Sequence, residues 1–327
     1  MAKFIIKRVL WMVPVLLGVL IIVFTINYFT PGDPVLALLG NSYTQEQYDA
    51  KAAELGLDQP YFAQLFNYIK GVVTEFDLGT SYQSKRAVST EILARFPVTL
   101  KLGIIGVLIT AIIGIPFGII SATHQYSPLD YTVTTVSLFF ASMPNFWMAL
   151  MLVLLFSLTL KWFPATGLGT WKGWVLPALA LGLSPIASVT RQTRSSMLEV
   201  IRQDYIKTAR AKGLSERKVV YKHALKNALI PVVTVIGMQI SLIMAGSVII
   251  ENIFSIPGVG SLLMSAINSK DYPVIQGTVL MLSACICLMN LLVDLIYGFI
   301  DPRIMALYSA GGKRKAKSKK SEAVKEA

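Results

Sequence analysis

The sequence has little charge, little cysteine and little histidine. Charged residues make up 15% of its 327 residues and hydrophobic residues 54%, whereas soluble domains usually contain about 25% charged residues. The mean hydropathy is +0.61. Cys285 and Cys287 lie in one apolar run, and His124 and His223 lie far apart in the chain. This composition excludes an ordinary soluble enzyme and predicts neither a disulfide framework nor a zinc site.

Motifs for catalysis and nucleotide binding are also missing from the sequence. It contains no phosphate-binding loop of the form G-x-x-x-x-G-K-S/T, no H-E-x-x-H and no G-x-S-x-G. Its apolar stretches hold neither the aspartate pair nor the Ser/His pair that an intramembrane protease would need. We therefore predict that the chain is not an enzyme and has no catalytic residue, cofactor, metal ion or ATP site of its own.

The sequence does contain six apolar stretches, each long enough for a helix to cross a bilayer, which takes about 20 residues. They lie near 9–29, 98–122, 132–158, 174–192, 228–250 and 274–300. The fourth is interrupted by Pro177, Gly182, Ser184 and Pro185, which membrane helices tolerate when neighbouring groups satisfy the freed backbone. The first is too long for a signal peptide, so we expect an uncleaved anchor. These stretches predict an all-α membrane protein with six transmembrane helices.

Lysine and arginine are distributed unevenly over the segments that flank these stretches. Segment 1–8 has three basic and no acidic residues, and segment 191–227 has ten basic and three acidic residues. Segment 30–97 has five basic and eight acidic residues, whereas segment 301–327 has eight basic and three acidic residues. Because basic residues stay on the cytoplasmic side of a membrane, both termini and 191–227 are predicted to be cytoplasmic. Segment 30–97 is predicted to be extracytoplasmic.

The tail 307–327 contains a dense run of basic residues and contributes to the net charge of +12. Such a run cannot bury enough apolar surface to fold, so we expect a disordered cytoplasmic tail. Beside a membrane span, it favours attraction to anionic lipid, at about 1 kcal/mol per basic residue. Binding to nucleic acid is not predicted.

The extracytoplasmic segment 30–97 is patterned like folded chain. Residues 43–57 are predicted to form an amphipathic helix, with Thr44 as its N-cap and Gly56 as its stop. Residues 61–73 are predicted to form a second helix. These helices could lie at the membrane interface and cap the spans, or they could form a docking surface for an extracytoplasmic partner.

Two features inside the predicted spans concern helix packing. Gly114 and Gly118 lie on one helix face, where a neighbouring helix can approach closely. Asp294 lies inside the last span, and a charge there can serve a proton relay or a structural ion pair. We found no second carboxylate within the spans and therefore favour a structural ion pair, with Arg191 or Arg194 as the partner.

The segment 191–227 is predicted to contain a short exposed helix. Ser196 and Glu199 have the spacing of a capping box, and Asp204 can cap a new helix that Gly213 ends. Ser215 can cap a third helix. The short helix has apolar residues on one face and basic residues beside it, namely Tyr205, Ile206, Ala209, Lys207, Arg210 and Lys212. Such a helix is suited to a groove on another protein rather than to binding a substrate.

Several segments of the chain are distinctive, above all DYIKTARAKG (204–213) and HALKNALIP (223–231). Others are TPGDP (30–34), DLGTS (77–81), SMPNF (142–146), IFSIPG (253–258), DYPV (271–274) and DPRI (301–304). Together they resemble the permease subunits of ABC importers, and in particular the first permease of dipeptide/oligopeptide importers (the DppB/OppB type). The resemblance covers residues 1 to about 306. In the general signature, Glu-Ala-Ala followed by three residues and Gly, only Ala209 and Gly213 match, so no role is transferred to Lys207.

This resemblance implies a type I ABC importer fold in a bacterial or archaeal inner membrane. It implies a second homologous permease, two ATP-binding cassette subunits, an extracytoplasmic solute-binding protein and a peptide solute. Residues Tyr205, Ile206, Ala209, Arg210 and Gly213 are then expected to couple the permease to the ATPase, with Ala209 facing the partner. Importers of this type also carry nickel chelates, glutathione or oligosaccharides.

The resulting division of the chain has four parts. They are the N-terminus with the first span (1–29), the extracytoplasmic segment (30–97), a five-helix permease core with its coupling loop (98–306, with 191–227), and the tail (307–327). Two other functions are consistent with a polytopic membrane protein. A proton-coupled secondary transporter would need Asp294 to titrate, and a membrane enzyme is disfavoured by the missing motifs.

Overall fold

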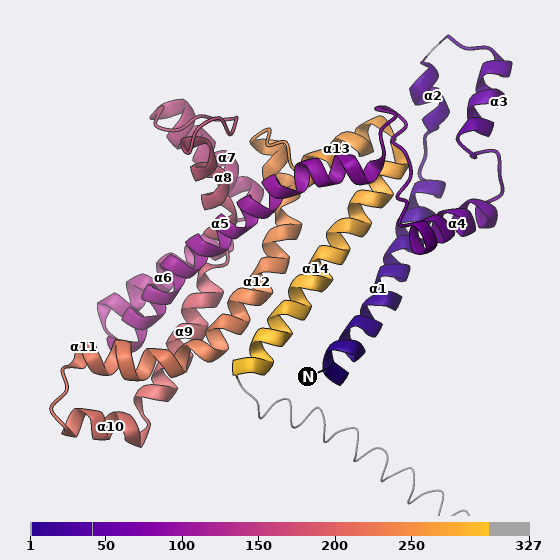
Figure 1. Cartoon of the computed structure of the whole chain (residues 1–327). Helices are drawn as coiled ribbons and strands as arrows, with labels where there is room; N and C mark the ends of the chain where they lie inside the picture. The colour runs from indigo at the N-terminus through magenta and orange to yellow at the C-terminus, as the bar shows by residue number, and fades with distance from the viewer. Residues whose placement is uncertain (1, 41, 301–327) are drawn as a thin grey trace, which may run out of the picture.

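A computed structural model describes residues 2–40 and 42–300, and in these residues the regular structure is helical apart from one isolated bridge between Thr80 and Ala87 (Figure 1). The first part of the chain forms α1 (Ala2–Phe29), α2 (Pro34–Leu39), α3 (Gln45–Glu54), α4 (Tyr61–Lys70), η1 (Gly71–Glu75) and α5 (Val88–Thr123). The middle forms α6 (Pro128–Ser142), α7 (Asn145–Leu152), η2 (Val153–Thr159), α8 (Lys172–Gly182), α9 (Ile186–Ile201) and α10 (Asp204–Ala211). The rest forms α11 (Glu216–Lys218), η3 (Val219–Ala224), α12 (Leu225–Ile253), α13 (Val259–Ser269) and α14 (Tyr272–Ile300). The predicted tail 307–327 lies outside the described residues.

The six predicted spans correspond to four long helices and two bent pairs. Helices α1, α5, α14 and the continuous helix that starts at α11 and runs into α12 are each long and apolar enough to cross a membrane. The chain also forms α6 with α7–η2, bent by 100°, and α8 with α9, bent by 60°. Counting each bent pair as one crossing gives six, as the sequence predicted. The chain is therefore an all-α membrane protein.

Proline explains where the two bent pairs break. Pro185 follows Ser184 between α8 and α9, at an interruption that the sequence had indicated. The third span was predicted as one stretch, 132–158, but it breaks before Pro144. A residue before proline is pushed out of the helical region, and Met143 is extended, with φ −90° and ψ 126°. The direction of the chain changes there because α6 ends and α7 starts anew.

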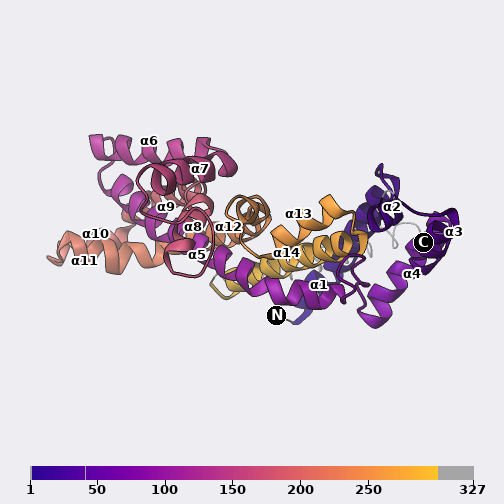
Figure 2. The same ribbon diagram turned by 90° about the horizontal axis from the view of Figure 1, so that it is seen from above.

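Helix α5 is the centre of one half of the molecule, and α8 and α9 pack along its glycines. A methyl group at Gly114 would lie 2.9 Å from the Cβ of Val189, and one at Gly118 would collide with Thr193. The close helix approach predicted from these two glycines is confirmed. Seen from above, α6, α7, α9 and α10 lie on one side of α12, α1, α13 and α14 lie on the other, and α5 extends from the first group to the second (Figure 2).

The two helices predicted within 30–97 are confirmed, and the helix that follows them begins earlier than its apolar stretch predicted. Thr44 caps α3 in a reciprocal capping box with Gln47, and Gly56 has φ +67°. Helix α5 begins at Val88, inside the predicted range 30–97. The apolar residues from 88 onward already pack against α13 and α14, so the helix starts before the apolar stretch that predicted it.

A buried carboxylate, which the sequence analysis missed, joins α12 to α5 and α13. Glu251 is fully buried. Its Oε1 accepts a 2.7 Å hydrogen bond from the Thr99 hydroxyl, and its Oε2 accepts a 3.1 Å hydrogen bond from the Ser261 backbone N–H, near the start of α13. The absence of a side chain at Gly258 and Gly260 leaves room for this carboxylate. Negative charge at a helix N-terminus is stabilised by the helix dipole and its free N–H groups.

Candidate coupling surface

The short helix α10 begins and ends close to where the sequence predicted. Its N-cap position is held by Gln203, and Asp204 is its first residue, where it accepts a 2.9 Å hydrogen bond from Lys207 Nζ. The nearby ammonium lowers the pKa of the Asp204 carboxyl. The backbone N–H groups of Gly213 and Leu214 donate to the carbonyls of Arg210 and Ala209. This is a Schellman termination, and Gly213 supplies the required positive φ of +77°.

The capping box predicted from Ser196 and Glu199 is wrong. Both residues lie inside α9, which runs without interruption from Ile186 to Ile201. Ser196 is buried there, and its hydroxyl accepts a 3.1 Å hydrogen bond from the Gln192 side chain. In a helix interior the backbone N–H groups already donate to carbonyls one turn back, so no free N–H remains for Ser196 to cap.

Helix α10 turns its apolar face toward its own chain. Ile206 is 0% exposed and Ala209 is 8% exposed. They pack in a cluster of α5, α9 and the helix that follows α10, with Ile119, Met197, Val219, Val220 and Ala224. The expectation that Ala209 faces a partner is therefore wrong for this structure. The amphipathic pattern was correct, but the chain itself covers the apolar face.

The remaining predicted residues lie on the exposed side of this loop. Tyr205 is 43% exposed, and its hydroxyl accepts a 2.7 Å hydrogen bond from Asn227. Arg210 forms a 2.7 Å ion pair with Glu216 at the start of α11. Lys207, Thr208, Ala211 and Lys212 are also exposed. The exposed surface of α10 is thus polar and basic, and the buried side chains beneath it attach the helix to the bundle.

The carboxylate at Asp294 forms an ion pair, but with a different partner from the one expected. Its Oδ2 lies 3.0 Å from Nη1 of Arg8 in α1. Arg194 instead binds Asp130 with two hydrogen bonds, of 3.2 and 2.9 Å. Ser121 and the backbone N–H of Tyr126 also donate to Asp130. Helices α1 and α14 lie side by side. Because they are the first and last spans, the sequence does not show that Arg8 and Asp294 meet.

Comparisons with known proteins identify one family. The family described as binding-protein-dependent transport system inner membrane component matches residues 114–306. The corresponding N-terminal family, of binding-protein-dependent transport system membrane components, matches residues 1–103.

Within the part of the chain that the structure describes, no group of three or more His, Cys, Asp or Glu side chains could hold a metal ion.

Several relatives match along nearly their whole length. The chain is 40% identical over 333 residues to the di/tripeptide transport system permease protein DppB of Pseudomonas aeruginosa, with 93% of this chain and 99% of the relative covered. It is 39% identical over 336 residues to the dipeptide transport system permease protein DppB of Escherichia coli, with the same shares covered. A putative peptide transport system permease protein of Brucella suis is 43% identical over 312 residues, again with 93% and 99% covered.

Solved structures support the fold. Two crystal forms of the MetNI methionine ABC transporter, in inward-facing conformations, match with TM-scores of 0.56 and 0.53 at 17% and 16% sequence identity. Each match covers 65% of this chain and 97% of that chain. At this identity the likeness shows the fold alone, which is that of a type I ABC importer permease.

Proposed function

Because the chain belongs to the family of binding-protein-dependent transport system inner membrane components, we propose that it is the permease subunit of an ATP-driven importer of di- and oligopeptides. Membership makes it a multi-pass protein of the inner membrane. The peptide solute is supported by the relatives, which are named as dipeptide, di/tripeptide and peptide permeases. Nickel chelates, glutathione and oligosaccharides remain alternative solutes, and solute binding to the cognate binding protein would distinguish them.

In the proposed complex this chain forms the translocation pathway with a second, homologous permease. Two ATP-binding cassette subunits bind on the cytoplasmic side and hydrolyse ATP, and an extracytoplasmic binding protein delivers the solute. Helix α10 lies at the same end of the bundle as the start of α1, whereas α2, α3 and α13 lie at the other end (Figure 1). The basic balance of 191–227 supports a cytoplasmic position for α10 and for both termini.

The observation that carries the proposal is the attachment of α10. Ile206 and Ala209 fix it to α5, α9 and the helix entering α12. The Arg210–Glu216 ion pair ties its last turn to α11. Protein interiors are close-packed and transmit displacement rather than absorbing it. A push on the exposed face of α10 is then passed to three helices of the bundle, as coupling to an ATPase requires.

A bulky residue on the exposed side of α10 tests this coupling. Ala211→Trp should abolish the stimulation of ATP hydrolysis by loaded binding protein in the reconstituted complex, because the indole would separate α10 from its groove. Its unfolding temperature should stay normal, since Ala211 is exposed. His124→Trp, in the exposed loop between α5 and α6, is the matched control and should retain stimulation. Full stimulation in the Ala211→Trp complex would contradict a coupling role for α10.

Single cysteines test the proposed orientation. Ser81 is buried against Asp271 and would label poorly, so the exposed Asp58 serves as the outer position and Ser215 as the inner one. With Cys285 and Cys287 replaced by alanine, Asp58→Cys should react with a membrane-impermeant maleimide in intact cells. Ser215→Cys should react only after the membrane is opened. Reaction of both in intact cells would contradict the orientation.

The outer segment, predicted as 30–97 and including the start of α5, is proposed to contact the binding protein together with the loops near 161–172 and 253–273. Its helix α4 leaves Phe62 80% exposed and Phe66 65% exposed, which also suits contact with the membrane interface. A photo-crosslinker at residue 62 should capture the binding protein in the assembled complex. Capture of lipid alone would favour the interface.

A further inference from the structure

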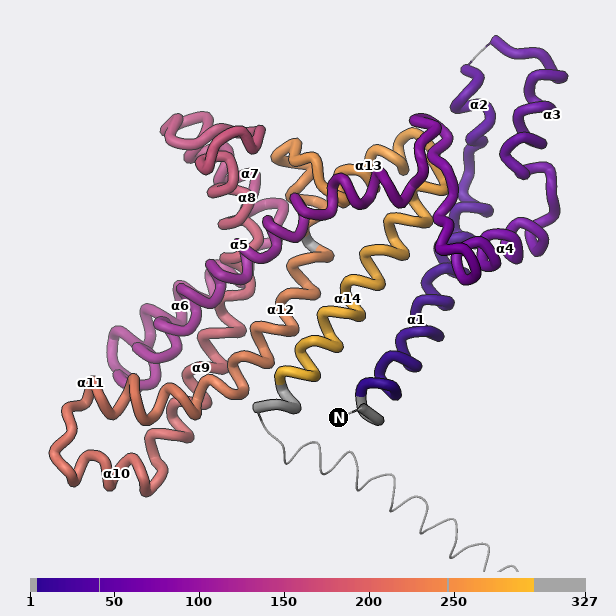
Figure 3. The backbone as a smooth tube through the Cα atoms, in the orientation of Figure 1, coloured from indigo at the N-terminus to yellow at the C-terminus, as the bar shows by residue number. Residues whose placement is uncertain are grey.

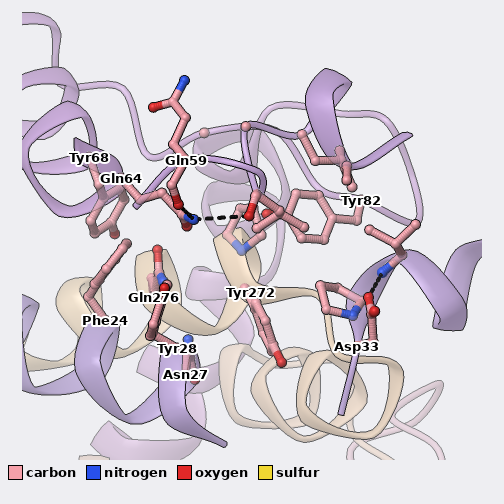
Figure 4. Close-up of a pocket in the computed structure, with 18 of the residues that line it drawn as sticks. Phe24, Asn27, Tyr28, Asp33, Gln59, Gln64, Tyr68, Tyr82, Tyr272 and Gln276 are labelled. Atoms are coloured by element: carbon pink, nitrogen blue, oxygen red, sulfur yellow. Dashed lines mark hydrogen bonds between the residues drawn. The ribbon is translucent and has the colours of Figure 1, made fainter. Parts of the chain in front are cut away.

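Two hollows of about 590 Å³ each lie outside the coupling surface, and they differ in whether their charged group has a partner. The first lies between α1, the helices α2–α4 and the start of α14 (Figure 4). Its carboxylate, Asp33, already accepts hydrogen bonds from the Val35 N–H and the Tyr48 hydroxyl. The second, which we call the α5–α8 groove, lies between α5, α8 and the loop that precedes α8. Both have the volume of a small-molecule pocket, about 300–1,000 Å³.

Lys101 of α5 is the charged group of the α5–α8 groove. Its Nζ lies 4.3 Å from the centroid of the Trp174 ring in α8. It forms neither an ion pair nor a hydrogen bond with any residue that the structure describes. An aromatic ring attracts a cation through its quadrupole but carries no net charge. Trp174 therefore holds the ammonium group in place without neutralising it, and the positive charge remains available to an anion.

The position of Lys101 within α5 indicates water rather than lipid beside it. Lys101 lies in the predicted span 98–122, and α5 is apolar enough to cross a membrane. Lysines inside membrane spans are costly in lipid and almost always face a water-filled cavity or the bundle interior. A lysine that serves lipid phosphates extends its stem toward the interface. The Lys101 ammonium instead lies over a ring of the neighbouring helix.

The walls of the α5–α8 groove narrow the chemistry of what can bind there. Among the described residues that line it, Lys101 alone is charged, and there is no Asp or Glu. Most of the other lining residues are apolar, among them Ile105, Ile109, Val175 and Leu179. A cationic group would be repelled by these walls, whereas a carboxylate beside an apolar side chain would match both the ammonium group and the apolar lining. The last residue of a peptide has this combination of groups.

We propose that the α5–α8 groove is a binding site for the carboxyl end of the transported peptide, with the peptide carboxylate paired to the Lys101 ammonium. The ammonium group has three N–H donors, and the Trp174 ring orients them. The apolar wall of the groove contacts the last side chain of the peptide. The proposal rests on the proposed function for the class of solute. It adds a residue of this chain that selects the charge of the solute.

Uptake by the reconstituted importer tests the role of the charge. Both permeases and both ATPase subunits are placed in liposomes with the binding protein, and import of isotope-labelled alanyl-leucine is measured. Lys101→Met keeps an unbranched side chain but removes the charge, so it should lower import at least about tenfold, as expected for a lost charge-assisted hydrogen bond. Lys101→Arg keeps the charge and should import within about threefold of the parent.

A matched control and a stability measurement exclude a general effect. Lys7→Met makes the same change at another exposed lysine, in α1 and outside the groove, and should import as the parent does. The unfolding temperature of Lys101→Met should equal that of the parent, because the Lys101 side chain is exposed.

A photoreactive solute tests whether the peptide itself occupies the groove. Alanyl-photoleucine, which carries a diazirine on its second side chain, is supplied on the binding protein while a non-hydrolysable ATP analogue holds the importer. After irradiation, mass spectrometry should find the label within 101–109 or 168–179, the two segments that line the groove. The label should persist in Lys101→Arg and be lost in Lys101→Met.

The outcomes separate this site from the proposed function. Equal import by the parent and Lys101→Met would overturn the site and leave the proposed function standing. Lower import by Lys101→Met without any label in either segment of the parent would also overturn the site, because Lys101 would then serve a lipid phosphate or an acidic side chain of the second permease. Loss of both import and label in Lys101→Met supports the site. Absence of peptide import by the parent itself would contradict the proposed function.

Discussion

Helices α4 and α10 are both short and amphipathic, and they lie in the two large segments between spans, yet the chain covers much less of the apolar surface of α4 than of α10. In α10, Ile206 and Ala209 are buried in a cluster of the same chain. In α4 no residue is buried, and Phe62 and Phe66 are exposed. An amphipathic pattern therefore indicates that one face of a helix is apolar, but it does not show which part of the chain, or which partner, covers that face. The bundle covers the apolar face of α10, whereas α4 packs Tyr61 and Tyr68 on Phe24 of α1 and leaves its two phenylalanines exposed.

The difference separates residues that hold a helix in place from residues that meet a partner. In α10 the apolar side chains hold the helix and the polar side chains are free to meet a partner. In α4 the exposed phenylalanines, Phe62 and Phe66, are the side chains available to a partner. Variants at matched positions of the two segments measure this difference.

The largest effect is expected from truncating a buried side chain. Ile206→Ala should destabilise the chain by about 2–5 kcal/mol, because it opens a cavity in a packed cluster. Phe62→Ala, although it removes more atoms, should change stability by about 0.5 kcal/mol or less, because its ring is exposed. Thermal unfolding in detergent micelles, followed by circular dichroism, measures both. Equal losses would show that α4 is packed in solution.

The next effect concerns two glycines that end helices in the same way. Gly56 and Gly213 have φ of +67° and +77°, and each donates its N–H in a Schellman termination. A valine at either position should cost about 1–2 kcal/mol of backbone strain. Gly213→Val should also reduce the ATP hydrolysis that the loaded binding protein stimulates, because the strain reorients α10. Gly56→Val should reduce this stimulated ATP hydrolysis less. Equal losses of stimulated ATP hydrolysis in the two variants would contradict a specific role for α10, because backbone strain in either segment would then have the same effect.

A smaller effect is expected from two tyrosine hydroxyls. The Tyr205 hydroxyl accepts a hydrogen bond from Asn227, and the Tyr61 hydroxyl lies 2.8 Å from the Thr25 hydroxyl. Tyr205→Phe and Tyr61→Phe should each cost about 0.5–1.5 kcal/mol in unfolding free energy, the usual net value of a hydrogen bond. A cost near zero at Tyr205 would show that water replaces the lost partner.

The smallest effect should follow from two exposed ion pairs, Lys51–Glu54 and Lys207–Asp204. In each, the ammonium group lowers the pKa of the carboxyl. The pair therefore forms fully above the ordinary carboxyl pKa and is lost as pH falls through the lowered value. Lys51→Met and Lys207→Met should raise the pKa of Glu54 and Asp204, as seen by NMR titration, with little change in unfolding temperature. A large drop in unfolding temperature would mean that the pair is shielded from solvent.

Local sequence signals predicted the helices well because their causes are local. The capping box at Thr44, the termination at Gly213 and the close approach at Gly114 each depend on residues within a few positions or on the absence of a side chain. The motifs of 204–231 also indicated the family, which the comparisons show. The break at Met143 had a local signal too, the proline that follows it.

The candidate site was predicted less well because its geometry depends on distant residues. Burial of Ile206 requires Met197 and Val219 to arrive from neighbouring helices. Arg8 and Asp294 meet only because the first and last spans lie together. Glu251 stands just past the end of its predicted span and was overlooked there. The local signal for it is an acidic residue followed by Gly258 and Gly260, because glycines leave room for a buried carboxylate close to the backbone.

The chain is helical from Glu216 to Ile253 and connects the two ends of the molecule, although its winding is that of a π-helix at η3 (Figure 3). At one end of this segment Val219 and Val220 pack against the buried face of α10. At the other end the Glu251 carboxylate accepts a hydrogen bond from the Ser261 N–H in the first turn of α13. With a rise of about 1.5 Å per residue, this helix is longer than the bilayer core is thick. If α10 is the coupling helix proposed above, this segment is the direct covalent connection through which its displacement would reach α13 at the opposite end of the bundle.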